Sequence, residues 1–262
     1  MKKLNTQKTT IFFLLFSFIS VSIFAQKTIE ASDIMDDIKK GKNISYKNAT
    51  INGTLDFTFM DDALPNLPNR KRWWNNGGSN KIEKQIDSKI SFINCTFTDN
   101  VLAYIPDERS GYTFTANFED TTIFKNCTFE GKALFKYSEF ESDSSFEGSN
   151  FNDDSTFKYA EFNKEISFKN TTFRELATFK YTEFSRNVSF KNAIFRDTAT
   201  FKYTKFNDGV SFNNTNFEED LNLKYTEVRG QFDITNMKVA YNIDSKYTKI
   251  NGKGFNKYLI DK

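Results

Sequence analysis

The chain has 262 residues, of which 31 are Phe and none is His. The absence of His excludes, within this chain, every mechanism that needs an imidazole base, a Ser-His or Cys-His pair, or a His-ligated metal. Charged residues make up 27% of the chain and the formal net charge is +2, which is unlike a membrane protein. The many Phe residues must therefore be buried in an arrangement that leaves room for many charges.

Residues 1–25 are typical of a secretory signal peptide. A basic start, Lys2, Lys3 and Lys8, precedes an apolar run from Ile11 to Phe24 that is short for a bilayer span. The small residue Ala25 favours cleavage after this position, and an uncleaved anchor is the alternative. We therefore expect a secreted or periplasmic protein that has no transmembrane span once the signal is removed.

Removal of this segment changes the charge of the chain. Without its three Lys, the 36 basic residues fall to 33, against 34 acidic residues, which gives a net charge of −1. A chain with this balance has no global basic field for nucleic acid, so nucleic acid is not an expected partner.

Residues 26–43 predict a helical cap. In the stretch 31–41, Ser32 is placed to cap the start of a helix, Ile34 and Ile38 share one face, and Gly41 is placed to end it. Such a helix would cover the open strand edges of a domain that follows.

A repeat dominates the rest of the chain. Nineteen Phe follow one another in alternating steps of six and five, so that two steps cover 11 residues and four steps cover 22, as from Phe118 to Phe140: Phe118, Phe124, Phe129, Phe135, Phe140, Phe146, Phe151, Phe157, Phe162, Phe168, Phe173, Phe179, Phe184, Phe190, Phe195, Phe201, Phe206, Phe212 and Phe217. An uncharged residue, usually small, stands two positions before each of them. This period fits neither a helix nor an ordinary strand, and it predicts a solenoid with Phe inside and small residues at its corners.

The repeat units resemble the pentapeptide-repeat family, as in Ala116-Asn117-Phe118, Ser149-Asn150-Phe151, Ala160-Glu161-Phe162 and Ala193-Ile194-Phe195. The resemblance implies an all-β fold, a right-handed quadrilateral parallel β-helix with one coil per four repeats. It is strong over 118–250 and weaker over 44–57 and 90–97, so we assign residues 44–250 to the β-helix.

Two interruptions of the register predict loops that project from the β-helix, near 60–88 and 98–113. All three Pro residues lie in these loops, where no ladder hydrogen bond is needed. Residues 251–262 form a tail that we expect to fold over the last coil.

Cys95 and Cys127 occur in the same Asn-Cys-Thr-Phe context at small inward positions of adjacent coils. This places them within range of a disulfide in an oxidising compartment. Two buried thiols acting as small apolar residues are the alternative, and a catalytic or metal-binding pair is a third.

Two outward columns recur once in every four repeats, and we name them together the lysine–tyrosine column. They comprise Lys136, Lys158, Lys180, Lys202, Lys224 and Lys246, and Tyr137, Tyr159, Tyr181, Tyr203, Tyr225 and Tyr247. One interpretation is structural: stacked Tyr shield the strands while nearby Glu offset the repulsion between Lys residues. The other is an aromatic, cationic track for a polysaccharide or an anionic polymer. A further column, Asn126, Asn170, Asn192 and Asn214, predicts stacked amides that stabilise turns.

The least repetitive stretch contains Arg70, Arg72, Trp73 and Trp74. Basic residues beside adjacent Trp suit a loop that binds a protein, a glycan or a lipid headgroup. The alternative is that the Trp pair folds back and covers the side of a coil.

These patterns predict an exported, non-catalytic scaffold or macromolecule-binding module of the cell envelope, with no cofactor or metal and with an unidentified protein or glycan as partner. A carbohydrate-binding or polysaccharide-cleaving β-helix is the alternative, since Asp, Lys and Arg can act in such enzymes. A more remote one is a DNA-mimicking, topoisomerase-protecting protein, which the export signal and the net charge of −1 disfavour. The sequence indicates no oligomeric state.

Overall fold

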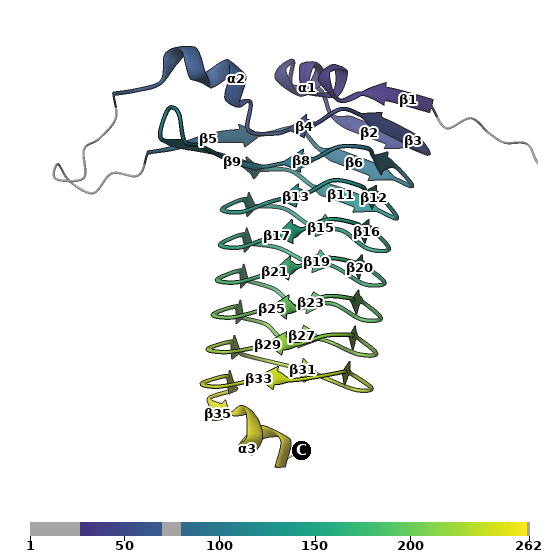
Figure 1. Cartoon of the computed structure of the whole chain (residues 1–262), viewed down its shortest axis with the longest axis vertical. Helices are drawn as coiled ribbons and strands as arrows, with labels where there is room; N and C mark the ends of the chain where they lie inside the picture. Colours follow the sequence, from purple (N-terminus) through teal and green to yellow (C-terminus); the bar gives the residue numbers. More distant parts are fainter. Residues whose placement is uncertain (1–26, 70–79, 261–262) are drawn as a thin grey trace, which may run out of the picture.

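The computed structural model describes residues 27–69 and 80–260. The chain forms a four-sided parallel β-helix, a rod in which each short strand pairs with its counterpart in the next coil (Figure 1). Between regular coils the pairing joins each residue to its equivalent one coil later, such as Phe140 with Phe162 and Phe162 with Phe184. The predicted fold class is confirmed.

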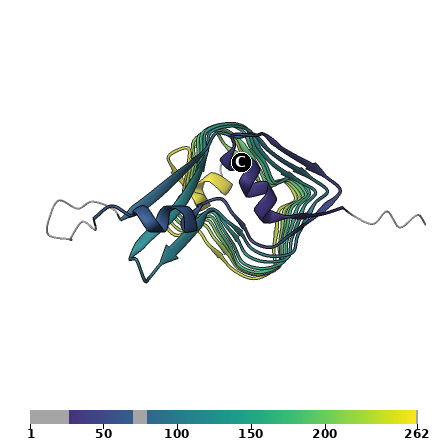
Figure 2. The ribbon, with the colours of Figure 1, turned by 90° about the horizontal axis from the view of Figure 1, so that it is seen from above.

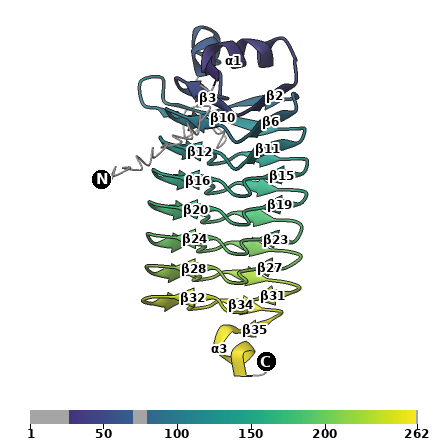
Figure 3. The ribbon, with the colours of Figure 1, turned by 90° about the vertical axis from the view of Figure 1, so that its right-hand side faces the viewer.

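Four sheets make the four sides of the rod (Figure 3). Sheet A contains, in order, β1 (Lys27–Glu30), β3 (Ala49–Asn52), β7 (Thr96–Phe97), β12 (Thr128–Phe129), β16 (Asn150–Phe151), β20 (Thr172–Phe173), β24 (Ile194–Phe195), β28 (Asn216–Phe217) and β32 (Lys238–Val239). Sheet B contains β2 (Ile44–Lys47), β6 (Ile90–Ile93), β11 (Thr122–Lys125), β15 (Ser144–Ser145), β19 (Ile166–Ser167), β23 (Val188–Ser189), β27 (Val210–Ser211) and β31 (Phe232–Asp233). Sheet C contains β33 (Ile243–Asp244), β29 (Leu221–Asn222), β25 (Ala199–Thr200), β21 (Ala177–Thr178), β17 (Ser155–Thr156), β13 (Ala133–Leu134), β8 (Val101–Leu102) and β4 (Leu55–Asp56). Sheet D contains β35 (Lys253–Gly254), β34 (Lys249–Ile250), β30 (Glu227–Val228), β26 (Lys205–Phe206), β22 (Glu183–Phe184), β18 (Glu161–Phe162), β14 (Glu139–Phe140), β10 (Tyr112–Phe118) and β5 (Lys81–Ile86), and β9 (Tyr104–Asp107) pairs with β10.

The Phe series fills the inside of the rod. Every member of the series is at most 1% exposed. Phe on the same side of successive coils stack face to face, as Phe146 does on Phe168, with centroids 5.3 Å apart and planes at 4°. Phe on adjacent sides meet edge to face, as Phe162 and Phe168 do at 87°. Such aromatic pairs add about 0.5–1.5 kcal/mol each to the effect of burial, so the core is stabilised along its whole length.

The small residues close the corners. The Thr182 hydroxyl donates a hydrogen bond to the carbonyl of Phe157 at 2.7 Å, and the Thr204 hydroxyl donates to the carbonyl of Phe179 at 2.6 Å. In each case the acceptor lies in the preceding coil. Ala160 and Ala193 are buried at equivalent positions, where only a short side chain is needed.

The N-terminal end of the rod is covered by α1 (Ala31–Lys39), whose Ile34 and Ile38 join the core cluster (Figure 3). The predicted cap by Ser32 is wrong, because the helix begins at Ala31 with Glu30 as N-cap and has no side-chain cap. Gly41 follows the helix with a positive φ of 70°. Residues 27–30, placed in the helical cap by sequence, form β1 and extend sheet A.

The C-terminal end is covered by β35, which pairs antiparallel with β34, and by α3 (Phe255–Ile260). The Phe255 ring is 7% exposed and meets Phe232 edge to face at 6.2 Å. The core thins toward this end, where Val239 is half-buried and Ile243 is exposed.

The two insertions differ from the predicted loops. The first contains α2 (Met60–Ala63) and the 3-10 helix η1 (Leu64–Asn66), but it ends in β5, which was expected to be loop. The second forms a hairpin of β9 with β10. Strand β10 also pairs with β5 in parallel, from Thr113 opposite Lys81 to Phe118 opposite Ile86, so both insertions extend sheet D sideways from the rod (Figure 2).

Candidate functional site

The lysine–tyrosine column lies at the corner between sheets C and D, where the chain turns from one strand to the next. In the coil at Phe157, the N–H of Ala160 donates to the Phe157 carbonyl at 2.9 Å, and Tyr159 has a φ of 59°. This is a type II turn, in which Gly or Asn is usual at the position that Tyr159 occupies. All six Tyr of the column have φ between 59° and 63°.

Stacking of the rings offsets this backbone strain. Successive Tyr centroids are 4.6–4.9 Å apart, and interior planes lie within 9° of parallel. A non-glycine residue in the left-handed region costs about 1–3 kcal/mol. A stacked aromatic pair stabilises the fold by about 0.5–1.5 kcal/mol. Each interior ring, from Tyr159 to Tyr225, belongs to two such pairs. The faces of the interior rings are consequently covered by their neighbours.

The Lys residues lie beside these rings. Each ammonium nitrogen is 4.7–5.8 Å from the centroid of the Tyr that follows it in the chain. Burial, followed by the charges of Lys136 and Lys180, lowers the pKa of Lys158. In the part of the chain that the structure describes, none of the six ammonium groups has a carboxylate oxygen within 4 Å. The column is thus a row of cations without a carboxylate partner among the described residues.

The neighbouring Glu residues pair elsewhere. Glu183, on sheet D, binds the Lys205 ammonium of the next coil at 3.0 Å. Burial and the charge of Glu161 raise the pKa of Glu139, so these carboxylates repel one another along their own column. Among the described residues no Glu lies within 4 Å of a Lys of the column, so an offset of the repulsion between Lys residues would act over a longer distance.

Two residues that sequence reasoning missed complete the upper end of the column. The Lys136 ammonium donates to the Tyr104 hydroxyl at 3.0 Å and lies 4.5 Å from the Tyr104 ring. The Lys81 ammonium lies 5.8 Å from the Tyr137 ring. Tyr104 takes the Lys position one coil earlier, but Ala103 stands where Phe is expected, so the sequence pattern is broken there.

The Asn column lies at the opposite corner, between sheets B and A, and its side chains form an amide ladder. Asn192 donates to Asn170 at 2.9 Å and Asn236 donates to Asn214 at 3.0 Å. The Asn residues of this column also have positive φ, from 51° to 57°. Gly148 occupies the same position in one coil, and a Cβ there would lie 2.0 Å from the Asn126 side-chain oxygen.

The two Cys residues are free thiols, both buried, and not the disulfide that the sequence left open. The Cys127 thiol donates to the carbonyl of Phe92 at 3.4 Å, and the Cys95 thiol donates to the carbonyl of Tyr46 at 3.6 Å. These are the bonds that Thr hydroxyls make in later coils. The thiol of Cys95 and burial together raise the pKa of Cys127, which keeps it protonated.

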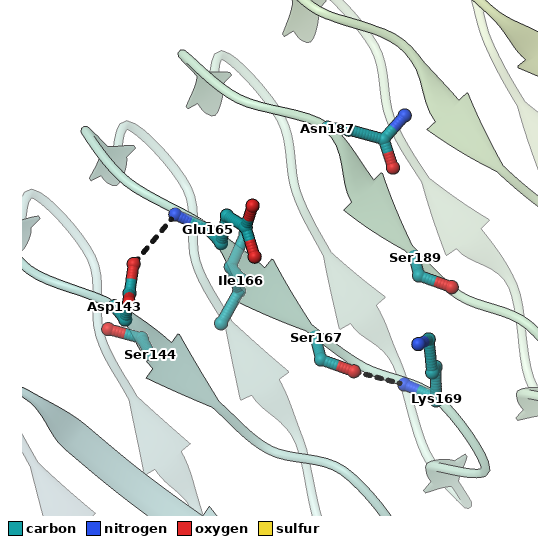
Figure 4. A pocket seen from close by; sticks show the side chains of 8 residues that line it. All are labelled: Asp143, Ser144, Glu165, Ile166, Ser167, Lys169, Asn187 and Ser189. Carbon is teal, nitrogen blue, oxygen red and sulfur yellow. Dashed lines mark hydrogen bonds between the residues drawn. The ribbon is translucent and has the colours of Figure 1, made fainter.

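The predicted binding loop with Arg70, Arg72, Trp73 and Trp74 lies outside the described residues. A shallow depression of about 280 Å³ lies along sheet B, lined by residues of successive coils. Figure 4 shows the side chains that line it. Its polar groups already bond within the rod: the Asp143 carboxylate accepts from the Glu165 N–H of the next coil at 3.3 Å, and the Ser167 hydroxyl accepts from the Lys169 N–H of its own turn at 3.3 Å. Residues 27–69 and 80–260 hold no group of three or more His, Cys, Asp or Glu that could bind a metal ion.

Comparison with known proteins assigns the repeat. Residues 114–161, 157–204 and 179–227 match the family described as pentapeptide repeats, with nine copies. Residues 114–227 belong to the pentapeptide-repeat family. Searches of curated proteins and of solved structures found no match. Five of the six Lys and Tyr pairs lie within this pentapeptide-repeat region, and the sixth follows it.

Pentapeptide-repeat proteins are in general non-catalytic structural repeat proteins. Helices of the described residues include none with the length and apolar character needed to span a bilayer.

Proposed function

We propose that this pentapeptide-repeat protein is an exported, non-catalytic rod of the cell envelope that binds another macromolecule along its side. The observation that carries the proposal is the lysine–tyrosine column. Six coils at a spacing of about 4.8 Å give a surface about 24 Å long. Stacked rings and ladder hydrogen bonds hold its side chains in a fixed repeat before any partner arrives, which reduces the entropy lost on binding.

Export is supported by the signal pattern of residues 1–25. The test is to express the full chain with this segment and to measure the intact mass of the protein in each cell fraction. We expect a mature form that begins at Gln26, outside the cytoplasm. A full-length chain that remains in the cytoplasm would overturn the export part of the proposal.

Binding is tested by sedimentation of purified mature protein with insoluble material from the native cell envelope. We expect the protein to pellet with this material in a saturable manner and to stay in solution without it. A mature protein that stays in the supernatant at every concentration of envelope material would overturn the binding part.

A further inference from the structure

The lysine–tyrosine column is unusual in its uniformity. It carries the same charge in six consecutive coils, whereas no other outward column of residues 133–254 keeps one charge in more than four. The column beside it on sheet D changes from Glu183 to Lys205, and the outward column on sheet B changes from Glu147 to Lys169. A solvated surface has no need for such a run, because neighbouring like charges repel one another by about 1 kcal/mol even in water.

The column is also partly desolvated. Lys158, Lys180 and Lys202 are half-buried, whereas Lys169 and Lys191 on sheet B are exposed. Half-buried cations with no carboxylate of the described residues within 4 Å gain most from an anionic ligand, because a charge-assisted hydrogen bond is stronger where water is partly excluded.

The covered ring faces limit the kind of ligand. A neutral sugar or a nucleic-acid base that stacks on an aromatic side chain needs a free face, and the interior rings stack with each other at 4.6–4.9 Å. The edges of the rings, with their hydroxyls, remain available. Burial, followed by the neighbouring rings, raises the pKa of Tyr181, so its hydroxyl stays protonated and can donate.

The spacing between successive coils further restricts the class of ligand. Phosphates of duplex DNA follow one another at about 3.4 Å along each strand, less than the coil spacing of about 4.8 Å. Acidic side chains on one face of an extended peptide recur at about 6.7 Å, which is more than this spacing. A polymer with one carboxylate on each sugar ring presents one negative charge per ring along its length, and the column presents one ammonium group per coil.

We propose that the lysine–tyrosine column binds a linear acidic polysaccharide laid along the rod. Its carboxylates accept hydrogen bonds from the Lys ammonium groups, and its hydroxyls or carboxylates accept from the edges of the Tyr rings. This inference rests on the proposed function, because it names the chemistry of the envelope macromolecule that the rod binds.

The test uses two forms of one polymer as probes, polygalacturonate and its fully methyl-esterified, neutral form. The column variant carries Lys158→Gln, Lys180→Gln and Lys202→Gln. A matched control carries Lys125→Gln, Lys169→Gln and Lys191→Gln, which removes the same charge from the opposite corner of the rod, at the end of β11 and in the turns that follow β19 and β23. Circular dichroism and the melting temperature establish that both variants fold as the parent does.

We expect the parent and the control to bind polygalacturonate with affinities within about twofold of each other. We expect the column variant to bind about tenfold more weakly, since the ion pairs that three ammonium groups would form with the polymer are lost. The dependence of affinity on salt should also become shallower only in the column variant. Equal losses in both variants, or equally tight binding of the methyl-esterified polymer, would overturn the inference.

A second measurement separates this inference from the proposed function. The parent is sedimented with native envelope material in the presence of excess polygalacturonate. Release of the protein supports the inference. A parent that pellets with the envelope, is not displaced, and is matched by the column variant would refute the ligand class and the column as the binding surface, whereas export and binding to the envelope would stand.

Discussion

The register of the coils predicts that a deletion of 22 residues will destabilise the rod less than a deletion of four residues. Removal of residues 177–198 takes out one whole coil. The deletion leaves the local sequence at the new junction unchanged, because residues 177–182 and 199–204 are both Ala-Thr-Phe-Lys-Tyr-Thr. Every remaining strand keeps a partner, and the rod loses one nearest-neighbour interface. We expect the variant to unfold within a few degrees of the parent and its denaturant m-value to fall by about a tenth.

Removal of residues 177–180 alone takes out a shorter segment but shortens one coil by about 13 Å of extended chain. The coil then cannot close. The downstream strands regain their pairing only if residues 181–198 leave the rod as a loop, in the way that the natural insertions do. That loop costs about 2.6 kcal/mol to close, which the whole-coil deletion does not incur.

The four-residue deletion should therefore melt roughly 5–10 °C below the whole-coil deletion, at about 2–4 °C per kcal/mol for a chain of this size. It should also aggregate more readily, because Phe184, Phe190 and Phe195 would be exposed in the loop. Melting temperatures from circular dichroism at equal concentration, with light scattering for aggregation, provide the measurement. Equal melting temperatures for the two deletions would refute the role assigned to the register.

Three substitutions test other features of the rod. Phe179 stacks between Phe157 at 5.1 Å and Phe201 at 4.9 Å, so Phe179→Ala should cost about 3–5 kcal/mol in urea unfolding, and Phe179→Leu, which keeps apolar volume but loses two stacked pairs, about 1–3 kcal/mol; a Leu variant as stable as the parent would contradict the stacking argument. Gly148→Asn should extend the amide ladder after a small movement of the Asn126 side chain and raise the melting temperature by about 2 °C, whereas Gly148→Val should lower it; no rise would show that the ladder adds nothing at this coil. Asp56 has a pKa raised above 3.8, mainly by burial, so the folded state holds its proton to higher pH than the unfolded state and stability falls as pH rises through that window. Asp56→Asn should remove this part of the pH dependence, measured as the difference in urea midpoint between variant and parent at about pH 3 and about pH 7, and a constant difference would contradict the assignment.

The sequence was sufficient to predict the regular part of the rod, because one residue type, Phe, marks the same inward position in every coil. Phe at steps of five and six can be buried together only if the chain turns a corner between them, so the series in 118–217 predicted the coils, the inward side and the columns at the same time. The lysine–tyrosine column followed from the same period. The backbone conformation of its Tyr residues did not follow from the period, because a positive φ near 60° cannot be recognised in a repeat where Asn and Tyr alternate at the turn position.

The sequence was insufficient where the repeat is interrupted. Strand β5 and the hairpin of β9 with β10 have no period of their own, and the parallel pairing of β5 with β10 joins residues on either side of a longer coil, such as Lys81 and Thr113. Tyr104 reaches the column only because this hairpin lies above it.

The sequence by itself determined that Phe is inside, that one coil takes four repeats and that the same side chains recur on each side of the rod. Only the tertiary structure decided that the Tyr rings cover one another's faces and that the Lys ammonium groups have no carboxylate of the described residues within 4 Å. It also decided that both Cys are hydrogen-bonded thiols. The physical reason is that a period fixes which residues share a column, whereas stacking, ion pairing and turn conformation depend on the neighbouring coil, which the chain reaches only after it has folded.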